Sequence, residues 1–497
     1  MDELMRPLVA LKRDELGALP AAVERPHYSR SALSPGIVHI GVGNFHRAHQ
    51  AFYLHRLMQE GAAHDFAIVG AGVRPGDATM REKLLAQDHL TTLIELDPDG
   101  SSAEVCGAMV DFVPVAGGNA SLIAQLAEDS IRIVSLTVTE GGYFVGSNGD
   151  FAANHPDIVY DAMHPDAPCT AFGAIVAGLA RRRAAGSGPF TVQSCDNLQG
   201  NGAITRAAVL GLADMQDPSL ARWIAEHITF PNSMVDCIVP ATGPAELTAA
   251  RAFGIDDRAP VTHENYRQWV MEDAFCAGRP DWDRVGATFT SRVHDYETMK
   301  IRILNAGHQV LANAGELLSV DTIADCMADP LIGSFFRAVQ HREIVPHVQP
   351  VPDMAPVEYV ALVERRFGNS AIRDTVRRVA FDGSSRHTGF VMPIVQDAIA
   401  AGAPVEGLAL VEALWARMCA GEREDGTVIE PNDPHWATLR TRAVTARSAP
   451  EAWLDLYGAI GADSRFAGAF GRWLGYLWRE GTASALKAYT HSEPLAS

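Results

Sequence analysis

The sequence predicts an α/β amino-terminal domain with a largely parallel sheet, followed by an all-α carboxy-terminal domain. From Gly36 to about Pro240, short apolar runs rich in β-branched residues alternate with helical stretches, as in parallel α/β sheets. After about Asp295, apolar residues recur at three- and four-residue spacing, which is typical of helices. We therefore expect two domains, over residues 1–290 and 291–497.

Seven apolar runs of the first domain are expected to form buried strands. They carry few charges, as strands covered on both faces of a parallel sheet do. They are Gly36–Gly41, Phe66–Val73, Thr91–Leu96, Ala108–Pro114, Ile131–Thr139, Phe190–Ser194 and Val235–Val239.

Seven segments of the second domain are expected to form helices, because their apolar residues share one face and Pro or Gly marks their ends. Four prolines make the stretch Val345–Pro356 an extended connector. The expected helices are Met299–Ala314, Leu331–His341, Val357–Phe367, Ala371–Phe381, Pro404–Met418, Ala449–Ile460 and Phe466–Arg479.

Composition and charge disfavour several classes of protein. The 497 residues are 47% hydrophobic and 20% charged, as in ordinary globular proteins. A formal net charge of −19 argues against binding to nucleic acid or to an anionic membrane. No signal peptide is recognisable, and no run approaches the ~20 apolar residues of a membrane span. Seven scattered cysteines without a C-x-x-C pair argue against a disulfide framework or structural zinc, so we expect a cytoplasmic protein without metal.

A glycine turn follows the first predicted strand and precedes a helical pattern. It runs Gly41-Val42-Gly43-Asn44-Phe45-His46-Arg47. Such a turn lets backbone approach a dinucleotide pyrophosphate, and the N–H groups of the following helix favour an anion. His46 stands where G-x-G-x-x-G has its third glycine, and a tight turn without a ligand would carry the same glycines. Arg47 is either a phosphate ligand or a cation on a solvated helix face.

The second predicted strand should end near the adenosine ribose of a bound dinucleotide. There the chain places Arg74 and, slightly later, Asp77. An acidic side chain suits the free ribose hydroxyls of NAD, whereas an arginine accommodates the 2′-phosphate of NADP. Asp77 favours NAD, and Arg74 leaves NADP open.

One predicted helix of the second domain carries three polar side chains on one flank. At about 100° per residue, Lys300 lies at 0°, His308 near 80° and Asn305 near 140°. A buried lysine is a candidate base near neutral pH, because burial disfavours its charged form. The alternative is a lysine that extends to solvent and a histidine hydrogen-bonded in the core. Tyr296-x-x-x-Lys300 also matches the short-chain dehydrogenase pair, but the chain length and the glycine spacing do not fit that class.

Two polar stretches follow predicted strands. They are Thr139-Glu140-Gly141-Gly142-Tyr143 and the segment Ser194–Gly202, which contains Asp196 and Asn197. Open α/β sheets bind ligands at the carboxyl ends of their strands, although Asn and Gly are also ordinary turn residues.

Together these motifs resemble the polyol-specific long-chain dehydrogenase/reductase family over nearly the whole chain. Besides the glycine turn and Thr139–Tyr143, the similarity rests on Cys195–Leu198, Phe230–Asp236 and above all Lys300-x4-Asn305-x2-His308. The resemblance implies a Rossmann-type NAD(P)-binding domain, a helical substrate domain and no metal. It also implies an NAD-dependent oxidoreductase that interconverts a polyol and its 2-ketose, such as D-mannitol and D-fructose, or acts on D-arabinitol or D-sorbitol. A monomer is the oligomeric state expected from the family.

The resemblance assigns catalytic roles to four residues. Lys300 would be the general acid/base. Asn197 and Asn305 would hydrogen-bond the reacting oxygen, and His308 would orient a neighbouring substrate hydroxyl.

Further residues are assigned to binding by the same resemblance. Asp236 and Arg378 would lie at the substrate, while Thr139 and Glu140 would join the glycine turn at the cofactor. Eight residues after Arg378 the family pattern carries a lysine, whereas this sequence has Arg386. The positive charge is kept but the head group differs, which puts the preferred sugar alcohol in question.

Two alternatives remain open. Arg378 and Arg386 could pair with a carboxylate, so the chain could be a fructuronate-type keto-uronate reductase. A catalytically silent nucleotide-binding protein of the same fold would bind the dinucleotide without turnover. The intact set of Lys300, Asn305 and His308 argues against the silent protein.

Overall fold

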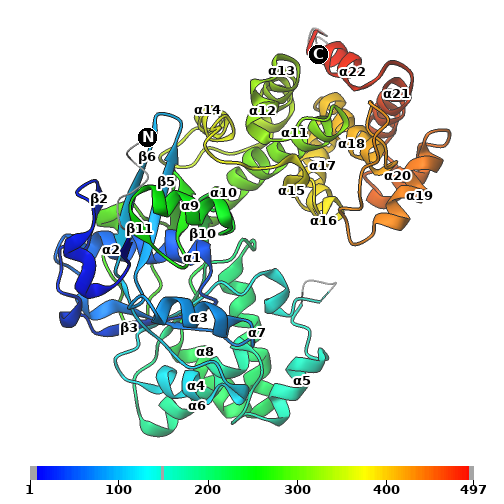
Figure 1. Ribbon diagram of the computed structural model, residues 1–497. Helices are drawn as coiled ribbons and strands as arrows, with labels where there is room; N and C mark the ends of the chain where they lie inside the picture. Colours follow the sequence, from blue (N-terminus) through cyan, green and yellow to red (C-terminus); the bar gives the residue numbers. More distant parts are fainter. Residues whose placement is uncertain (1–7, 147–149, 492–497) are drawn as a thin grey trace. The chain divides into compact units, whose positions relative to one another are not determined.

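A computed structural model describes residues 8–146 and 150–491 of the chain, which forms two compact units. One unit ends at His294 and the other begins at Asp295 (Figure 1). The first unit contains the sheets, whereas residues 295–491 form helices and loops with no named strand among them. The predicted fold class, an α/β domain followed by a helical domain, is confirmed.

A five-stranded parallel sheet forms the centre of the first unit. Its spatial order is β7 (Met109–Phe112), β4 (Ala67–Ala71), β3 (Pro35–Ile40), β8 (Ile133–Leu136) and β9 (Thr191–Ser194). Counted along the chain, this is the order third, second, first, fourth and fifth that defines Rossmann-type sheets. The order reverses between β3 and β8, which is where such sheets bind ligands.

Both faces of this sheet are covered by helices. Val38 and Ile40 of β3 share one core cluster with residues of α4 (Ala120–Ala127), α6 (Ala171–Ala185), α7 (Asn201–Gln216) and α8 (Pro218–His227). Ile37 belongs to the opposite core, which includes α2 (Gln50–Gln59). Strand residues alternate between faces, so each strand contributes to two cores, and its apolar run is explained.

All seven predicted strands occur, but two of them lie outside the parallel sheet. β5 (Thr91–Asp97) pairs antiparallel with β6 (Gly100–Cys106), beside β12 (Val261–Glu264) and β2 (Val23–Glu24). The turn Asp97-Pro98-Asp99-Gly100 is too short for a parallel crossover, and its Pro-Asp-Gly sequence was an unused turn signal. β10 (Ser233–Asp236) is likewise antiparallel to β13 (Gln268–Met271), which pairs with β14 (Thr288–Phe289).

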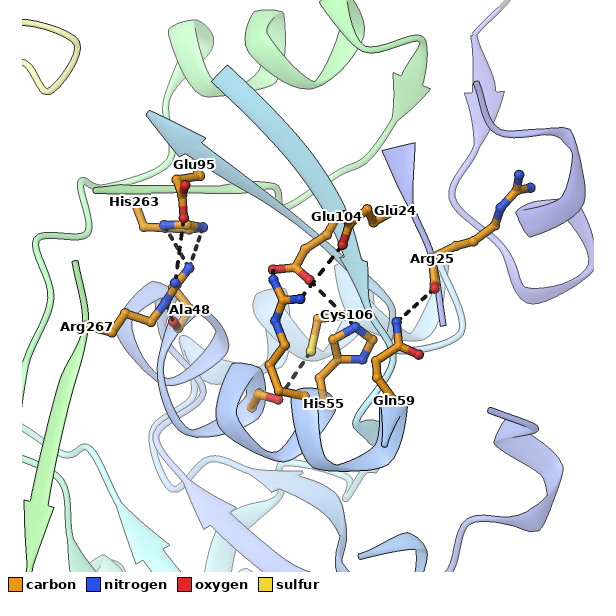
Figure 2. A network of polar contacts seen from close by, with 12 residues as sticks. Glu24, Arg25, Ala48, His55, Gln59, Glu95, Glu104, Cys106, His263 and Arg267 are labelled. Carbon is orange, nitrogen blue, oxygen red and sulfur yellow. Dashed lines mark hydrogen bonds and ion pairs between the residues drawn. The ribbon is translucent and has the colours of Figure 1, made fainter. Parts of the chain in front are cut away.

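The helix predicted after the glycine turn is broken into α1 (Asn44–Ala48) and α2. His49 separates them with φ −120° and ψ −90°. Figure 2 shows Arg267 reaching the freed carbonyl of Ala48, to which its Nε donates at 2.9 Å. The same guanidinium lies 3.6 Å from the centre of the Phe52 ring and 3.8 Å from Glu95. The break is therefore stabilised by contacts from outside the helix.

The second unit is built around α18 (Glu406–Cys419), which is buried from Gly407 to Cys419. A helix that is buried all round belongs to the core. It packs against α11 (Ala306–Leu317) and α21 (Ser464–Glu480), and α13 (Pro330–Val339) packs against α22 (Thr482–His491). No helix in the described ranges has the length and apolar character required to cross a bilayer.

Three predicted helices differ from the observed ones. The segment predicted over Met299–Ala314 consists of α10 (Val293–Met299), the π-helix η8 (Lys300–Asn305) and α11. The helix predicted over Ala371–Phe381 is reduced to α15 (Val376–Val379), because the Thr375 hydroxyl caps it and accepts the Arg378 N–H at 3.3 Å. The helix predicted over 449–460 is split into α20 (Glu451–Leu454) and η12 (Asp455–Tyr457).

Buried histidines should make the fold sensitive to acid. Burial lowers the pKa of His39, His55 and His263 from 6.5 to about 3. Between these two values the unfolded chain binds protons that the folded chain does not, so stability rises with pH across that window. We expect the free energy of unfolding to fall as the pH is lowered from 6.5 toward 3, because each of these histidines takes up a proton on unfolding.

Urea unfolding measured between pH 7 and pH 4 tests this expectation. His55→Phe should reduce the slope of stability against pH by one histidine's share, whereas His227→Phe, at an exposed position, should leave the slope unchanged. An unchanged slope in His55→Phe would contradict the assignment.

Candidate active site

The first unit has a cleft of about 540 Å³ at the point where the strand order reverses. Its lining includes the turn Gly41–Gly43 after β3, Arg74 and Asp77 after β4, and Thr137–Thr139 after β8. Cys169, Thr170 and Ala171, at the start of α6, line another part of it. The predicted strand ends therefore meet at one cavity.

The two glycines of the turn are required for different reasons. Gly41 has φ +97°, and a Cβ there would lie 2.1 Å from the carbonyl oxygen of Thr137. Gly43 has ordinary extended backbone, and a Cβ there would have no neighbour nearer than 4.0 Å. The fold itself thus requires a glycine at position 41. At Gly43 the missing side chain instead leaves open space beside the turn. This cradle fits the pyrophosphate of a dinucleotide.

Arg47 lies beneath the turn rather than in the cleft. It is buried, and its guanidinium donates to the Ala259 carbonyl and, at 2.7 Å, to Asn44 Oδ1. Asn44 in turn donates to the Pro240 carbonyl at 2.8 Å. Burial lowers the pKa of Arg47 to about 10. Arg47 therefore ties the turn to neighbouring loops, and the expectation that it reaches a phosphate is not supported by its position.

His46 and Phe45 also fall outside the described lining of the cleft. The buried His46 ring stacks on His39 of β3, with centroids 3.4 Å apart. Phe45 stacks on His49 at 4.8 Å. The sequence motif is thus divided: its first three residues face the cleft and its last four support the turn.

Asp77 and Arg74 both line the cleft at the end of β4. Asp77 begins α3 (Asp77–Leu85), and its Oδ2 accepts the Arg74 N–H at 3.0 Å. A Cβ at Gly72 would lie 2.5 Å from that oxygen, so the glycine makes room for the carboxylate. Arg74 is exposed, so an acidic and a basic group are both present where the ribose is expected.

Thr139 is held in a backbone conformation that is essentially reserved for glycine, with φ 66° and ψ 163°. Asp196, one residue before Asn197, holds it there. Its carboxylate accepts the N–H groups of Val138 at 2.9 Å and Thr139 at 3.1 Å, and the Tyr143 hydroxyl at 2.7 Å. Asp196 was not among the predicted site residues, and an aspartate at a strand end was the sequence signal for it. Glu140 begins η6 (Glu140–Tyr143), but its side chain lies outside the described part of the chain.

Asn197 and Asp236 lie at the carboxyl ends of β9 and β10 in the first unit. Asn197 is exposed just after β9, whereas Asp236 is buried as the last residue of β10. Asn201 connects these segments, because its Nδ2 donates to the carbonyls of Ser233 at 2.8 Å and Asp196 at 3.1 Å. The amide of Asn197 and the carboxylate of Asp236 are thus carried by mutually supported segments.

In the second unit, Lys300 begins a π-helical turn that ends at Asn305. The Ala306 N–H bonds to the Ile301 carbonyl, five residues back. A turn of this width brings the fifth residue close above the first, so Asn305 lies nearer to Lys300 than the 140° of a regular helix would place it. The Lys300 side chain is largely buried, with 7% of the residue exposed. Such wide turns occur frequently at functional sites.

Two residues support the wide turn. Gln340 Nε2 donates to the Ile303 carbonyl at 2.8 Å. A Cβ at Gly307 would lie 2.7 Å from that Nε2, so glycine is needed for Gln340 to approach. The wide turn could not be predicted from the spacing of Lys300 and Asn305. The Ile303 carbonyl and the Gln340 amide that stabilise it belong to different helices.

His308 is a neutral imidazole at this site. Burial lowers its pKa to about 3, Asp374 opposes that shift, and Arg378 and Arg386 add to it. Its ring stacks on Phe367 of α14 (Pro356–Phe367) at 4.1 Å. Its buried Nε2 lies 3.8 Å from Asp374 and makes no hydrogen bond among the described residues. The stacking on Phe367 and the neighbouring Asp374 carboxylate therefore fix the ring.

Arg378 and Arg386 both lie close to His308, but the partners of their guanidinium groups differ. Arg378 makes a two-pronged contact with Asp374, at 2.6 and 2.7 Å. Arg386 donates to the Val379 carbonyl at 2.6 Å. Asp374 was not predicted, although its four-residue spacing from Arg378 was a usable signal.

The described side chains do not meet the requirements of a metal site. Within residues 8–146 and 150–491, no three His, Cys, Asp or Glu residues are placed to hold a metal ion. All seven cysteines are free thiols, and burial raises the pKa of Cys106 to about 12.

Both units match one known family. Residues 35–284 match the mannitol dehydrogenase Rossmann domain, and residues 292–472 match the mannitol dehydrogenase C-terminal domain. The chain belongs to the mannitol dehydrogenase family. The predicted resemblance to polyol-specific long-chain dehydrogenases is confirmed, and with it the expectation of an oxidoreductase.

Similar proteins cover the chain almost completely. The mannitol 2-dehydrogenase of Cereibacter sphaeroides is 53% identical over 94% of this chain and 99% of its own length. The solved structure of Pseudomonas fluorescens mannitol 2-dehydrogenase, a ternary complex with NAD and D-mannitol, is 40% identical with a TM-score of 0.87. The match covers 97% of this chain and 100% of that chain. A D-sorbitol dehydrogenase in substrate-free form is 34% identical with a TM-score of 0.86, covering 96% and 100%.

The two glycines provide a test of the turn. Gly41→Ala should lower the free energy of unfolding by more than about 2 kcal/mol, because the added Cβ meets the Thr137 carbonyl at a positive φ. Gly43→Ala should change it by less than about 0.5 kcal/mol, because its backbone is extended and its surroundings are open. Urea unfolding measures both, and equal losses would contradict the distinction.

Proposed function

We propose that the chain is an NAD-dependent mannitol 2-dehydrogenase that oxidises D-mannitol to D-fructose and catalyses the reverse reduction. The observation that carries this proposal is the π-helical turn with Lys300, Asn305 and the neutral His308, in a chain that also has a glycine cradle in a Rossmann-type cleft. The mannitol 2-dehydrogenases similar along the full chain support the substrate.

Oxidation of a secondary alcohol requires removal of the hydroxyl proton while hydride leaves the carbon. Lys300 is proposed to take that proton with its largely buried amine. The amide N–H groups of Asn197 and Asn305 would stabilise the developing alkoxide, by about 2–4 kcal/mol each. In reduction, Lys300 returns the proton to the same oxygen.

His308 is proposed to orient the substrate rather than to exchange protons with it. Its pKa of about 3 keeps the imidazole neutral at physiological pH. A neutral ring offers one donor and one acceptor, which suits a hydroxyl next to the reacting carbon. The side chain keeps 14% of its surface exposed, so a substrate hydroxyl can approach the ring.

The cleft of the first unit is the proposed site for NAD, which accepts the hydride when it is bound. Gly41, Val42 and Gly43 would lie against its pyrophosphate, and Asp77 would bind the ribose hydroxyls. Thr139 and Glu140 are proposed to lie at the nicotinamide side. Asn44, Phe45, His46 and Arg47 would act by supporting the turn.

The pairing of Arg378 supports a neutral polyol over a keto-uronate. The Nε and one Nη2 N–H of its guanidinium donate to Asp374, so this ion pair offsets the positive charge that would attract a substrate carboxylate. We place Asp236, Arg378 and Arg386 at the substrate as binding groups. D-Sorbitol and D-arabinitol remain candidate substrates, and the sorbitol dehydrogenase relative supports the former. A cytoplasmic monomer without nucleic-acid or membrane partners completes the proposal.

Lys300→Ala should abolish mannitol oxidation, lowering kcat by at least about a hundredfold, because the proton acceptor is lost. Binding of NADH, followed by its fluorescence, should stay close to that of the unaltered chain. Lys487→Ala, at an exposed position of α22, is the matched control and should retain full turnover. Normal turnover by Lys300→Ala would refute the assignment.

A substrate panel distinguishes the alternatives. We expect NADH formation from mannitol with NAD, and no NADH consumption with fructuronate, because Asp374 neutralises Arg378. NADP is tested in parallel, since Arg74 lines the cleft. Faster turnover of fructuronate than of the mannitol–fructose pair would favour the reductase, and cofactor binding without any turnover would favour the silent protein.

A further inference from the structure

A chain of buried polar side chains runs beneath the glycine turn and ends on it. Its centre is His39 of β3, whose ring nitrogens lie 2.7 Å from Ser135 Oγ and 2.8 Å from Thr137 Oγ1. Thr137 Oγ1 donates to the Gly41 carbonyl at 2.6 Å. At the other end, Ser135 Oγ lies 2.7 Å from the side-chain amide of Gln50. His39, Ser135 and Gln50 are buried, with at most 1% of each residue exposed.

The hydrogen bonds of this chain have one consistent direction. Thr137 gives its only proton to Gly41, so it must accept from His39 Nε2–H. Burial keeps the imidazole neutral, so its Nδ1 carries no proton and must accept from Ser135. With Gln50 Oε1 facing it, Ser135 would need its single proton for both Gln50 and His39. Exchanging the amide N and O of Gln50, which leaves the side chain in place, removes this conflict. In the opposite orientation Gln50 Nε2 is buried without a partner.

His46 closes this chain from the side of α1. Its ring lies flat on His39, with 14° between the planes and 3.4 Å between the centroids. Neither ring nitrogen of His46 has a hydrogen-bond partner among the described residues, so its contact with His39 is through the ring face. In G-x-G-x-x-G turns the third glycine permits close packing of helix on strand. Here two stacked rings occupy that place, which explains the departure at His46.

We propose that His39 is a positioning residue for the dinucleotide site, holding the Gly41 carbonyl through Thr137 with His46 as its cover. The inference rests on the proposed binding of NAD in the cleft. Gly41 is also bound by its N–H to the Ala71 carbonyl at 3.0 Å, so both of its peptide groups are fixed. Fixing Gly41 determines where Val42 and Gly43 stand against the pyrophosphate. The chain of hydrogen bonds therefore acts on cofactor affinity.

Four single substitutions in the full chain test this inference, together with one double substitution that combines His39→Phe and Thr137→Val. His39→Phe keeps a ring for stacking but removes both nitrogens, and Thr137→Val removes the hydroxyl at nearly constant shape. Thr137→Ser keeps the hydroxyl. Thr191→Val is the matched control, because Thr191 is a buried threonine of β9 whose hydroxyl bonds to Thr229 at 3.0 Å and is not part of the described cleft lining. The probe is NADH, titrated by its fluorescence, with melting temperatures recorded for every variant.

We expect His39→Phe and Thr137→Val each to raise the Kd for NADH about tenfold, the effect of leaving a partner of a buried hydrogen bond unsatisfied. Because both act on one chain of bonds, the double variant should also show about a tenfold change, not a hundredfold one. Thr137→Ser should restore the affinity, and Thr191→Val should leave it unchanged. The KM for mannitol at saturating NAD should be the same in His39→Phe as in the unaltered chain.

Several results would overturn the inference. These are an unchanged Kd in His39→Phe, a hundredfold loss in the double variant, or a loss in Thr191→Val as large as that in Thr137→Val. If His39→Phe does not fold, the comparison of Thr137→Val with Thr137→Ser decides, and equal affinities would overturn it. Failure of the unaltered chain to bind NADH would instead overturn the proposed function, and this inference with it.

Discussion

The cleft of the first unit depends on how closely β3 and β8 approach each other where both strands end. The Thr137 carbonyl leaves no room for a Cβ at Gly41, and Gly41 takes a positive φ that other residues avoid. This steric contact makes the chain turn sharply at the reversal of strand order, so that Gly43 opens onto a cleft instead of onto protein. The sheet topology sets the position of the cleft, and the missing side chains of Gly41 and Gly43 provide the space there.

Around this turn, the groups that face the cleft depend on others that do not. Thr139 keeps a strained backbone because Asp196 binds two successive N–H groups. The same principle holds at the wide turn of the second unit, where Gln340 binds the Ile303 carbonyl. In each case an unfavourable local geometry is stabilised by one polar side chain from another segment. Each such geometry lies next to a residue proposed to contact cofactor or substrate.

This dependence explains which features could be predicted from sequence. The strands and the glycine turn are local patterns in the sequence, and helical spacing places Lys300, Asn305 and His308 on one flank. The catalytic roles of these three residues are implied by the family resemblance, not by their spacing. The wide turn at Lys300, the role of Asp196 and the buried position of Arg47 depend on contacts between distant segments, such as Arg47 with Ala259. Periodicity cannot reveal these contacts. The shortened helix at Val376 is an intermediate case, since the capping Thr375 was visible in the sequence.

The charges at the second unit's site show why pairing matters more than composition. From sequence alone, Arg378 and Arg386 form a cationic pair suited to a carboxylate. Asp374 changes this, because it neutralises Arg378 and also stands 3.8 Å from His308. The Arg378–Asp374 ion pair orients both side chains and carries little net charge. Recognition of a substrate by this pair therefore depends on directed hydrogen bonds. Hydroxyl groups of a sugar alcohol can both donate and accept such bonds, whereas a carboxylate gains less from a guanidinium whose charge Asp374 already offsets.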